Sequence, residues 1–237
     1  LKILKDSNDL PEILSVLPVI ELDLSSLVTF NIDTLRHCSI IALTLPDKTQ
    51  LNFDQLLSLG LKKLAVRKCT NHDFSRLRTS RIEILELPES QITSTEFCAD
   101  MRLTRLNLAN TPIEELSHVS ESKLTHLNLL KTKISNLDSL AGMPIQEVSL
   151  AGTIIDDLEP IARANKLRVV DIRSTRVMDL TPLSDCPVEE LLLPGSGVSE
   201  IECLIDCPLK KLNLAGIKLD NYQALENFRL ESLTLSP

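Results

Sequence analysis

The chain has 237 residues and a net charge of −8, and aromatic residues make up only 3% of it, with no Trp. This acidic balance argues against nucleic acid as a partner, because a phosphate backbone calls for clustered basic side chains, and it argues equally against docking on an anionic membrane. No apolar run approaches the roughly 18 residues that a membrane-spanning helix needs, so we expect no membrane insertion of this region.

The N-terminal segment carries Lys, Asp, Asn and Pro where a secretion signal would have an apolar stretch, so no signal peptide is predicted. Leu1 and Ile3 fit the fourth and sixth positions of a truncated coil of the repeat described next, and Pro237 directly follows a predicted strand. Neither end resembles the polar cap that normally closes a solenoid. We therefore expect the array to be part of a longer protein, either cytoplasmic or tethered to a membrane elsewhere.

One pattern, L-x-x-L-x-L, recurs along the chain from residue 19 onward. Its first position steps by 21 residues, with a single step of 22 after residue 145. Apolar residues also recur at the eleventh, fourteenth and seventeenth positions, so each coil has an apolar side that only stacking can bury. The coils start near residues 19, 40, 61, 82, 103, 124, 145, 167, 188, 209 and 230.

The alternation L-x-L predicts a short strand at the start of each coil, and equivalent coils place these strands in parallel. With the truncated first coil, this gives an α/β fold of about 12 parallel strands on a concave face. The connecting segments are too short for long helices and predict one or two turns of 3₁₀ or α-helix on the convex face. The strand-lined side is therefore the tighter, concave one.

The ninth position of the coils carries small hydroxyl side chains directly after the strand. A hydroxyl can donate to and accept from backbone groups of the turn, so we interpret this ladder as structural. Its members are Ser90, Thr111, Thr132, Thr153, Thr175 and Ser196.

The segment "LTHLNLLKTKISNLDSLAGMPIQEVSLAGTIIDDLEPIARANKL" resembles the leucine-rich-repeat family, and the resemblance covers essentially the whole chain. The half-repeat "I-x-x-L-x-x-L" is similar to the internalin and phosphatase-regulator subclass. The fragments "GMPIQEVSLAGT" and "CPVEELLL" resemble arrays that accompany bacterial serine/threonine protein kinases. The resemblance implies a right-handed solenoid that binds proteins.

Charged residues of neighbouring coils alternate in sign near the N-terminal end. Lys62, Lys63, Arg67 and Lys68 precede a coil that carries glutamates at residues 83, 86 and 89. We expect cross-strand pairing on a solvated sheet, worth about 0.2–1 kcal/mol per pair.

The sequence contains no catalytic motif of the kinds that hold phosphate, activate a nucleophile or bind a metal. Of the four histidines, only His126 is expected to face the concave side. Cys186 and Cys207 occupy the same position of adjacent coils, within reach of a disulfide, yet we expect free thiols there. We predict no enzyme, no cofactor and no metal site in this region.

The leading hypothesis is a protein-interaction scaffold or sensor module, expected to be monomeric, that binds a partner protein on its concave face. Two alternatives stay open: a regulatory array of a larger bacterial signalling enzyme such as a serine/threonine kinase, and a secreted effector or adhesin. The third, fifth, seventh and eighth positions of a coil should face the partner, because alternate strand residues face opposite sides. In the central coils these are Arg105, Asn107, Asn110, His126, Asn128, Leu130, Lys131, Glu147 and Ser149.

Overall fold

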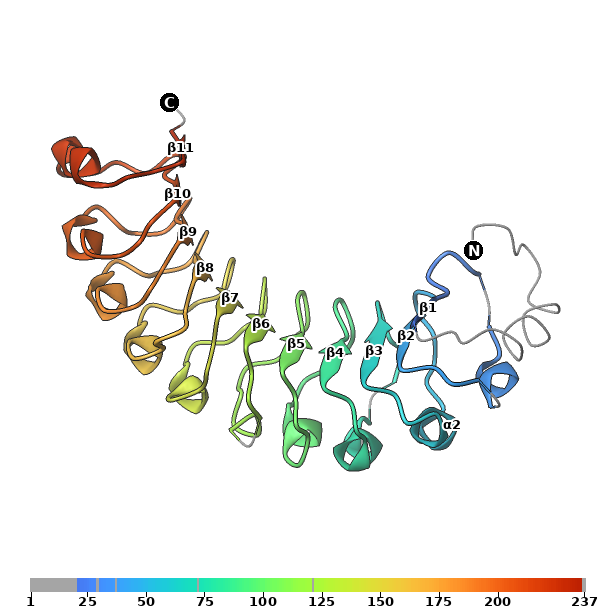
Figure 1. Cartoon of the computed structure of the whole chain (residues 1–237). Helices are drawn as coiled ribbons and strands as arrows, with labels where there is room; N and C mark the ends of the chain where they lie inside the picture. The colour runs from blue at the N-terminus through green and yellow to red at the C-terminus, as the bar shows by residue number, and fades with distance from the viewer. Residues whose placement is uncertain (1–20, 29, 37, 72, 121, 236–237) are drawn as a thin grey trace.

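The computed structural model describes residues 21–235 except residues 29, 37, 72 and 121. Over these residues the chain forms a curved solenoid whose inner, concave edge is lined by one parallel sheet (Figure 1). The sheet has 11 strands in chain order, and the twelfth predicted strand, at Leu1 and Ile3, lies outside the described residues. The strands are β1 (Glu21–Asp23), β2 (Ala42–Leu45), β3 (Lys63–Val66), β4 (Ile84–Glu86), β5 (Arg105–Asn107), β6 (His126–Asn128), β7 (Glu147–Ser149), β8 (Val169–Asp171), β9 (Glu190–Leu192), β10 (Lys211–Asn213) and β11 (Ser232–Thr234).

The register places equivalent positions of successive coils opposite one another. Leu106 pairs with Leu127, and Leu127 pairs with Val148. The coil of 22 residues keeps this register, because its extra residue lies outside the strand. Asn165 and Lys166 stand there where the preceding coil has the single residue Pro144.

Short helices cover the convex side, as predicted (Figure 1). Side chains of Asn, Asp or Ser begin several of them by accepting from a backbone N–H, as Asp157 does from Glu159 at 2.8 Å. The helices are η1 (Ile32–Leu35), α2 (Phe53–Ser58), η2 (Ser75–Thr79), η3 (Glu96–Cys98), η4 (Asp138–Leu140), η5 (Glu159–Ile161), η6 (Thr181–Leu183), η7 (Glu202–Leu204) and η8 (Tyr222–Asn227). Among the described residues, no helix is both long and apolar enough to cross a membrane.

A continuous apolar core runs between the sheet and the convex segments. The strand-centre leucines of β1 to β10 are buried, with Leu85 at 0% and Leu127 at 3% exposure, whereas Leu233 of the last strand is 40% exposed. Near the N-terminal end the rings of Phe53, Phe74 and Phe97 pack against one another across coils, with centroid separations of 5.9 and 5.5 Å. Each coil thus buries its apolar side only against its neighbours, as the repeat predicts.

The residue at the eighth position of most coils has a left-handed backbone. This residue turns the chain away from the strand, and its N–H still donates to the next coil, at 2.7 Å for both Asn110 and Lys131. Glycine adopts this conformation without strain, whereas the Cβ of any other residue makes it less favourable. Positive φ angles occur here at Lys68, Glu89, Asn110, Lys131, Gly152, Ser174, Gly195 and Gly216.

The hydroxyl ladder serves the backbone, as its sequence position suggested. Thr132 is 3% exposed, and its hydroxyl donates to the carbonyl of Leu129 at 2.8 Å. Thr111, Thr153 and Thr175 make the same bond at 2.6–2.7 Å. Ser196 differs, since its buried hydroxyl has no hydrogen-bond partner among the described residues.

This difference provides a matched pair of substitutions. Thr132→Val keeps the shape but removes a buried hydrogen bond, so the free energy of unfolding should fall by about 1 kcal/mol. Ser196→Ala removes a hydroxyl without such a bond and should leave stability unchanged within about 0.5 kcal/mol. Urea denaturation of both variants measures this, and equal losses would show that the ladder bonds contribute nothing.

The cysteines are free thiols, as predicted. The sulfurs of Cys186 and Cys207 lie 3.4 Å from the carbonyl oxygens of Ala162 and Leu183, respectively. Burial raises the pKa of the Cys207 thiol to about 11. Both side chains therefore pack as small apolar groups at the corner before a strand.

Cross-strand charge pairing on the first coils is confirmed in part. Lys62 lies 3.1 Å from Glu83, and Arg67 lies 2.7 Å from Glu89. Lys63 turns the other way and reaches past Ala42 of β2 to contact Glu21 of β1 at 3.4 Å. Glu86 has no ion pair among the described residues, so the expected cross-strand pairing holds for Glu83 and Glu89 only.

Glu189 is held between Arg168 and Lys210, whose side chains donate to its carboxylate at 2.9 and 2.8 Å. The hydrogen bonds from Arg168 and then Lys210 lower the pKa of this carboxyl to about 2. Because the folded pKa is depressed, the stabilisation is present above the ordinary value near 4.5 and is lost as the pH falls toward 2. The carboxyl carbon of Glu189, followed by NMR, should titrate with a midpoint near pH 2. Lys210→Gln should raise this midpoint. A midpoint near 4.5 in the wild type would contradict this.

Candidate functional site

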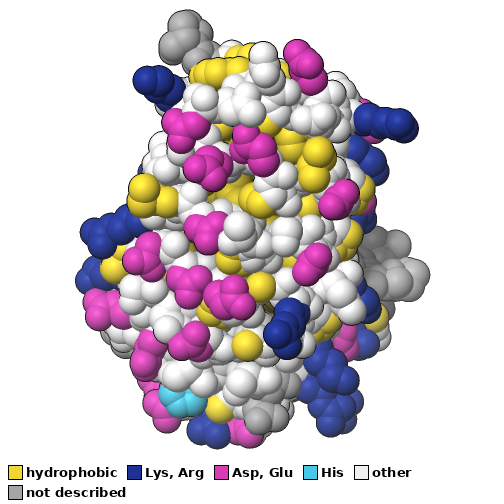
Figure 2. All heavy atoms as spheres, turned by 90° about the vertical axis from the view of Figure 1, so that its left-hand side faces the viewer, with side chains coloured by type: hydrophobic (Ala, Val, Ile, Leu, Met, Phe, Trp, Pro, Cys, Tyr) yellow, Lys and Arg dark blue, Asp and Glu magenta, His cyan; other side chains and the backbone are white. Residues whose placement is uncertain are grey.

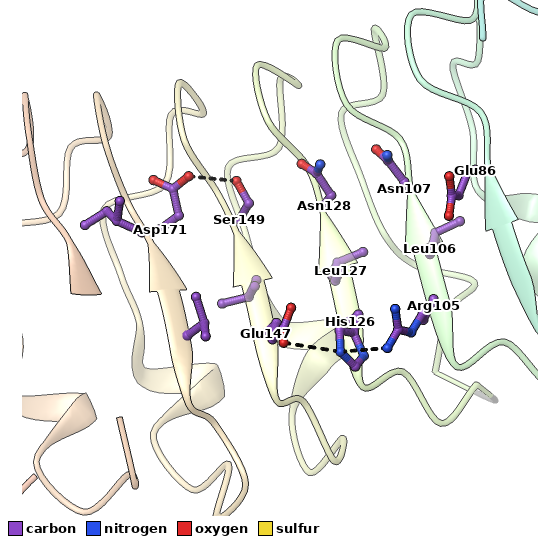
Figure 3. Close-up of a pocket in the computed structure, with 13 residues that line it drawn as sticks. Glu86, Arg105, Leu106, Asn107, His126, Leu127, Asn128, Glu147, Ser149 and Asp171 are labelled. Atoms are coloured by element: carbon purple, nitrogen blue, oxygen red, sulfur yellow. Dashed lines mark hydrogen bonds and ion pairs between the residues drawn. The ribbon is translucent and has the colours of Figure 1, made fainter. Parts of the chain in front are cut away.

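The concave face carries a shallow hollow of about 350 Å³ that is lined by residues of β4 to β9 (Figure 3). Six of the nine residues predicted to face a partner line it: Arg105, Asn107, His126, Asn128, Glu147 and Ser149. The other three, Asn110, Leu130 and Lys131, lie in the turns after β5 and β6, and they are not among the residues that line the hollow. The alternation of strand residues therefore brings most of the predicted set together.

The lining residues form two rows across the strands (Figure 3). Third-position residues make one row, which runs from Arg105 through His126 to Glu147. Fifth-position residues make the other row, which runs from Glu86 to Asp171. The leucines between the rows, such as Leu127, turn away from the concave side and are buried.

His126 connects the charged groups of the first row. Its Nδ1 lies 2.8 Å from the Thr125 hydroxyl, which itself donates to the Thr104 carbonyl at 3.0 Å. Because that hydroxyl donates to the backbone and a guanidinium can only donate, the contacts assign Nδ1 as the donor to Thr125 and Nε2 as the acceptor from Arg105 at 3.2 Å. Glu147 lies 3.5 Å from the same nitrogen. Arg105 thus contacts an imidazole, and no carboxylate lies within ion-pair distance of it among the described residues.

Asn107 and Asn128 stand side by side in the second row. The side-chain oxygen of Asn107 accepts from the N–H of Ala109, and that of Asn128 accepts from the N–H of Leu130, both at 3.0 Å. These bonds fix which end of each amide is the oxygen. Within the described chain, neither side-chain NH₂ group donates a hydrogen bond, so both remain available to a ligand.

The polar side chains at the opposite end of the hollow form hydrogen bonds with one another. Arg173 donates to both oxygens of Asp171, at 2.8 and 2.7 Å, and these hydrogen bonds raise the pKa of its guanidinium. The Ser149 hydroxyl donates to Asp171 at 3.1 Å. This end therefore offers a partner fewer unused polar groups than Arg105 and the two asparagines do.

Seven further residues line the hollow. Leu106, Leu127 and Val148 are buried residues at strand centres, and sequence reasoning missed the other four, Glu86, Val169, Asp171 and Leu192. These four hold the third or fifth position of the coils that begin at residues 82, 167 and 188. The positions that identified the other residues also identify these four, once the same positions are read in those three coils.

Thr125, His126 and Glu147 superficially resemble a nucleophile, a base and an acid in series. The Thr125 hydroxyl donates its hydrogen bond to the Thr104 carbonyl and not to the ring, so His126 does not activate it as a nucleophile. Of the other histidines, His118 contacts Ser117 at 3.0 Å, and residues 37 and 72 lie outside the described part. No grouping of three potential metal ligands occurs among the described residues. The arrangement suits binding through hydrogen bonds and charge.

No family model and no curated protein matches the sequence. Among solved structures, internalin C2 of Listeria monocytogenes is similar, with 24% identity and a TM-score of 0.70 over 78% of this chain and 84% of that one. An internalin F of the same species shares 21% identity and a TM-score of 0.70 over 95% and 75% of the two chains. TLR13, solved as a complex with ssRNA13, shares 19% identity and a TM-score of 0.59 over 91% of this chain and 36% of that one. These likenesses concern the fold.

Proposed function

We propose that this chain, a leucine-rich-repeat solenoid, is a binding scaffold that holds a partner protein in its concave hollow. The observation that carries the proposal is the pair of unused amide NH₂ groups beside an Arg without a carboxylate partner. Polar groups that a fold does not use internally are available to fix the orientation of a ligand. The hollow is too open to enclose a small molecule, since it lies on the face of a sheet (Figure 3).

The shape of the solenoid supports a macromolecular partner. The sheet curves along its whole length, so many coils can contact one extended ligand (Figure 1). Solenoids of similar fold include one solved with RNA, so any binding experiment has to test nucleic acid as a separate ligand. We favour protein because the chain has a net charge of −8 and carboxylates flank the hollow on both sides.

Affinity capture from a lysate of the source organism tests this proposal. The informative variant is Arg105→Gln with Asn128→Asp, because Asp retains the acceptor that the Leu130 N–H needs. The control is Arg163→Gln with Asn165→Asp, which makes the same charge change on exposed residues outside the concave face.

The wild type and the control should capture the same protein, identified by mass spectrometry, and the concave variant should lose it. Equal capture by all three chains would move the binding surface away from the hollow. Captured material that is removed by ribonuclease would contradict a protein partner.

A further inference from the structure

The concave positions of the two coils that contain β5 and β6 carry no carboxylate. They hold only hydrogen-bond donors, apolar groups and one imidazole, whereas the flanking coils place Glu86 and Glu147 at the borders. We call these eight residues the donor strip. It consists of Arg105, Asn107, Ala109, Asn110, His126, Asn128, Leu130 and Lys131.

Two cations of the donor strip differ from the other cations on the concave positions. Arg105 and Lys131 have no carboxylate within ion-pair distance among the described residues. The remaining concave cations each pair with a carboxylate at 2.7–3.5 Å: Lys63, Arg67, Lys68, Arg173 and Lys211. In a chain with more acidic than basic residues, two unpaired cations on one strip indicate a site for an incoming negative group.

The spacing of the donors suits a short extended segment. Asn107 and Asn128 lie on adjacent strands, about 4.8 Å apart, and Arg105 stands two residues from Asn107, about 6.6 Å along the strand. A carboxylate binds a guanidinium through two parallel hydrogen bonds, and amide NH₂ groups suit backbone carbonyl oxygens. The strip therefore offers one strong charged contact and two neutral donors beside it.

We propose that the donor strip binds an extended segment of the partner protein that bears an acidic side chain. Its carboxylate pairs with Arg105, and its backbone carbonyls accept from Asn107 and Asn128. This inference rests on the proposed function and names the chemistry of the partner at that site. A nucleic acid fits less well, since a phosphate backbone carries repeated charges and would pass Glu86 or Glu147 on leaving the strip.

The test selects peptides from a displayed library of random twelve-residue sequences on the wild-type chain. The enriched peptides are then measured against three chains by fluorescence anisotropy. These are the wild type, Arg105→Gln with Asn128→Asp, and the control Arg163→Gln with Asn165→Asp. A single-stranded oligo-uridine of twenty nucleotides is titrated in parallel at the same salt concentration.

Selected peptides should contain more Asp and Glu than the starting library. Their affinity should fall at least tenfold on the concave variant and stay within twofold on the control. Replacing the acidic residue of a selected peptide by its amide should weaken binding to the wild type and to the control, and should weaken binding to the concave variant little further.

No enrichment, enriched peptides without acidic residues, or equal binding to all three chains would each overturn the inference. Binding of the oligo-uridine that is lost on the concave variant would assign the strip to nucleic acid instead. A protein captured by the concave face without any acidic preference would refute this inference but leave the proposed function standing.

Discussion

Leu127→Ala should lower the free energy of unfolding by roughly 2–5 kcal/mol, because a truncated core side chain leaves a cavity that its surroundings cannot fill. Leu127 is 3% exposed and stands in the middle of the leucine stack, between Leu106 and Val148 of the adjacent strands. Each coil is supported only by its neighbours, so the cavity weakens two interfaces at once. Guanidinium denaturation followed by circular dichroism gives the value.

The control for this prediction is Lys123→Ala, since Lys123 is exposed and directly precedes the coil that contains Leu127. It should change the stability by no more than about 0.5 kcal/mol. Similar losses for Leu127 and Lys123 would mean that the assigned register of the repeat is wrong.

Gly152→Val should cost about 2 kcal/mol, because a β-branched residue is strained in a left-handed turn. Gly152 has a φ of +69°, and an added Cβ would lie 2.9 Å from Cγ of Lys131 in the preceding coil. The end of that side chain can move, so most of the cost should come from the backbone. Thermal and urea unfolding measure the loss.

Gly216 separates the two contributions, since it has a φ of +72° and nothing within 4 Å of the added Cβ. Gly216→Val should therefore lose nearly as much stability as Gly152→Val. Lys131→Gly, at a φ of +54°, should gain about 0.5–1 kcal/mol. Unchanged stability in both valine variants would show that the turn adapts and stores no strain.

Much of the fold follows from the leucine spacing alone. A repeat of 21 residues with L-x-L at its start forces parallel strands, and each strand found lies where this pattern predicts it. The roles of Thr132 and Cys207 were predicted correctly as well, because a buried position after or before a strand restricts what a side chain can do. The same positional argument placed six of the proposed site residues in one hollow.

Side-chain partners could not be predicted in the same way. Lys63 of β3 has one carboxylate on β1, Glu21, and another on β4, Glu86, and only the three-dimensional arrangement selects Glu21. The use of the Asn107 and Asn128 oxygens by the following turn depends on a local backbone geometry that the repeat does not encode. For Asn110 and Lys131, the left-handed turn was not anticipated, and it moves both residues to the edge of the concave face.

The side-chain amide signals of Asn107 and Asn128 provide the most direct measurement. In ¹H–¹⁵N NMR spectra, titration with a selected acidic peptide should shift both NH₂ signals saturably, with the affinity found by anisotropy. The signal of Asn165, which lies outside the concave face, should stay in place. Shifts at Asn165 with unchanged signals of Asn107 and Asn128 would contradict binding in the concave hollow.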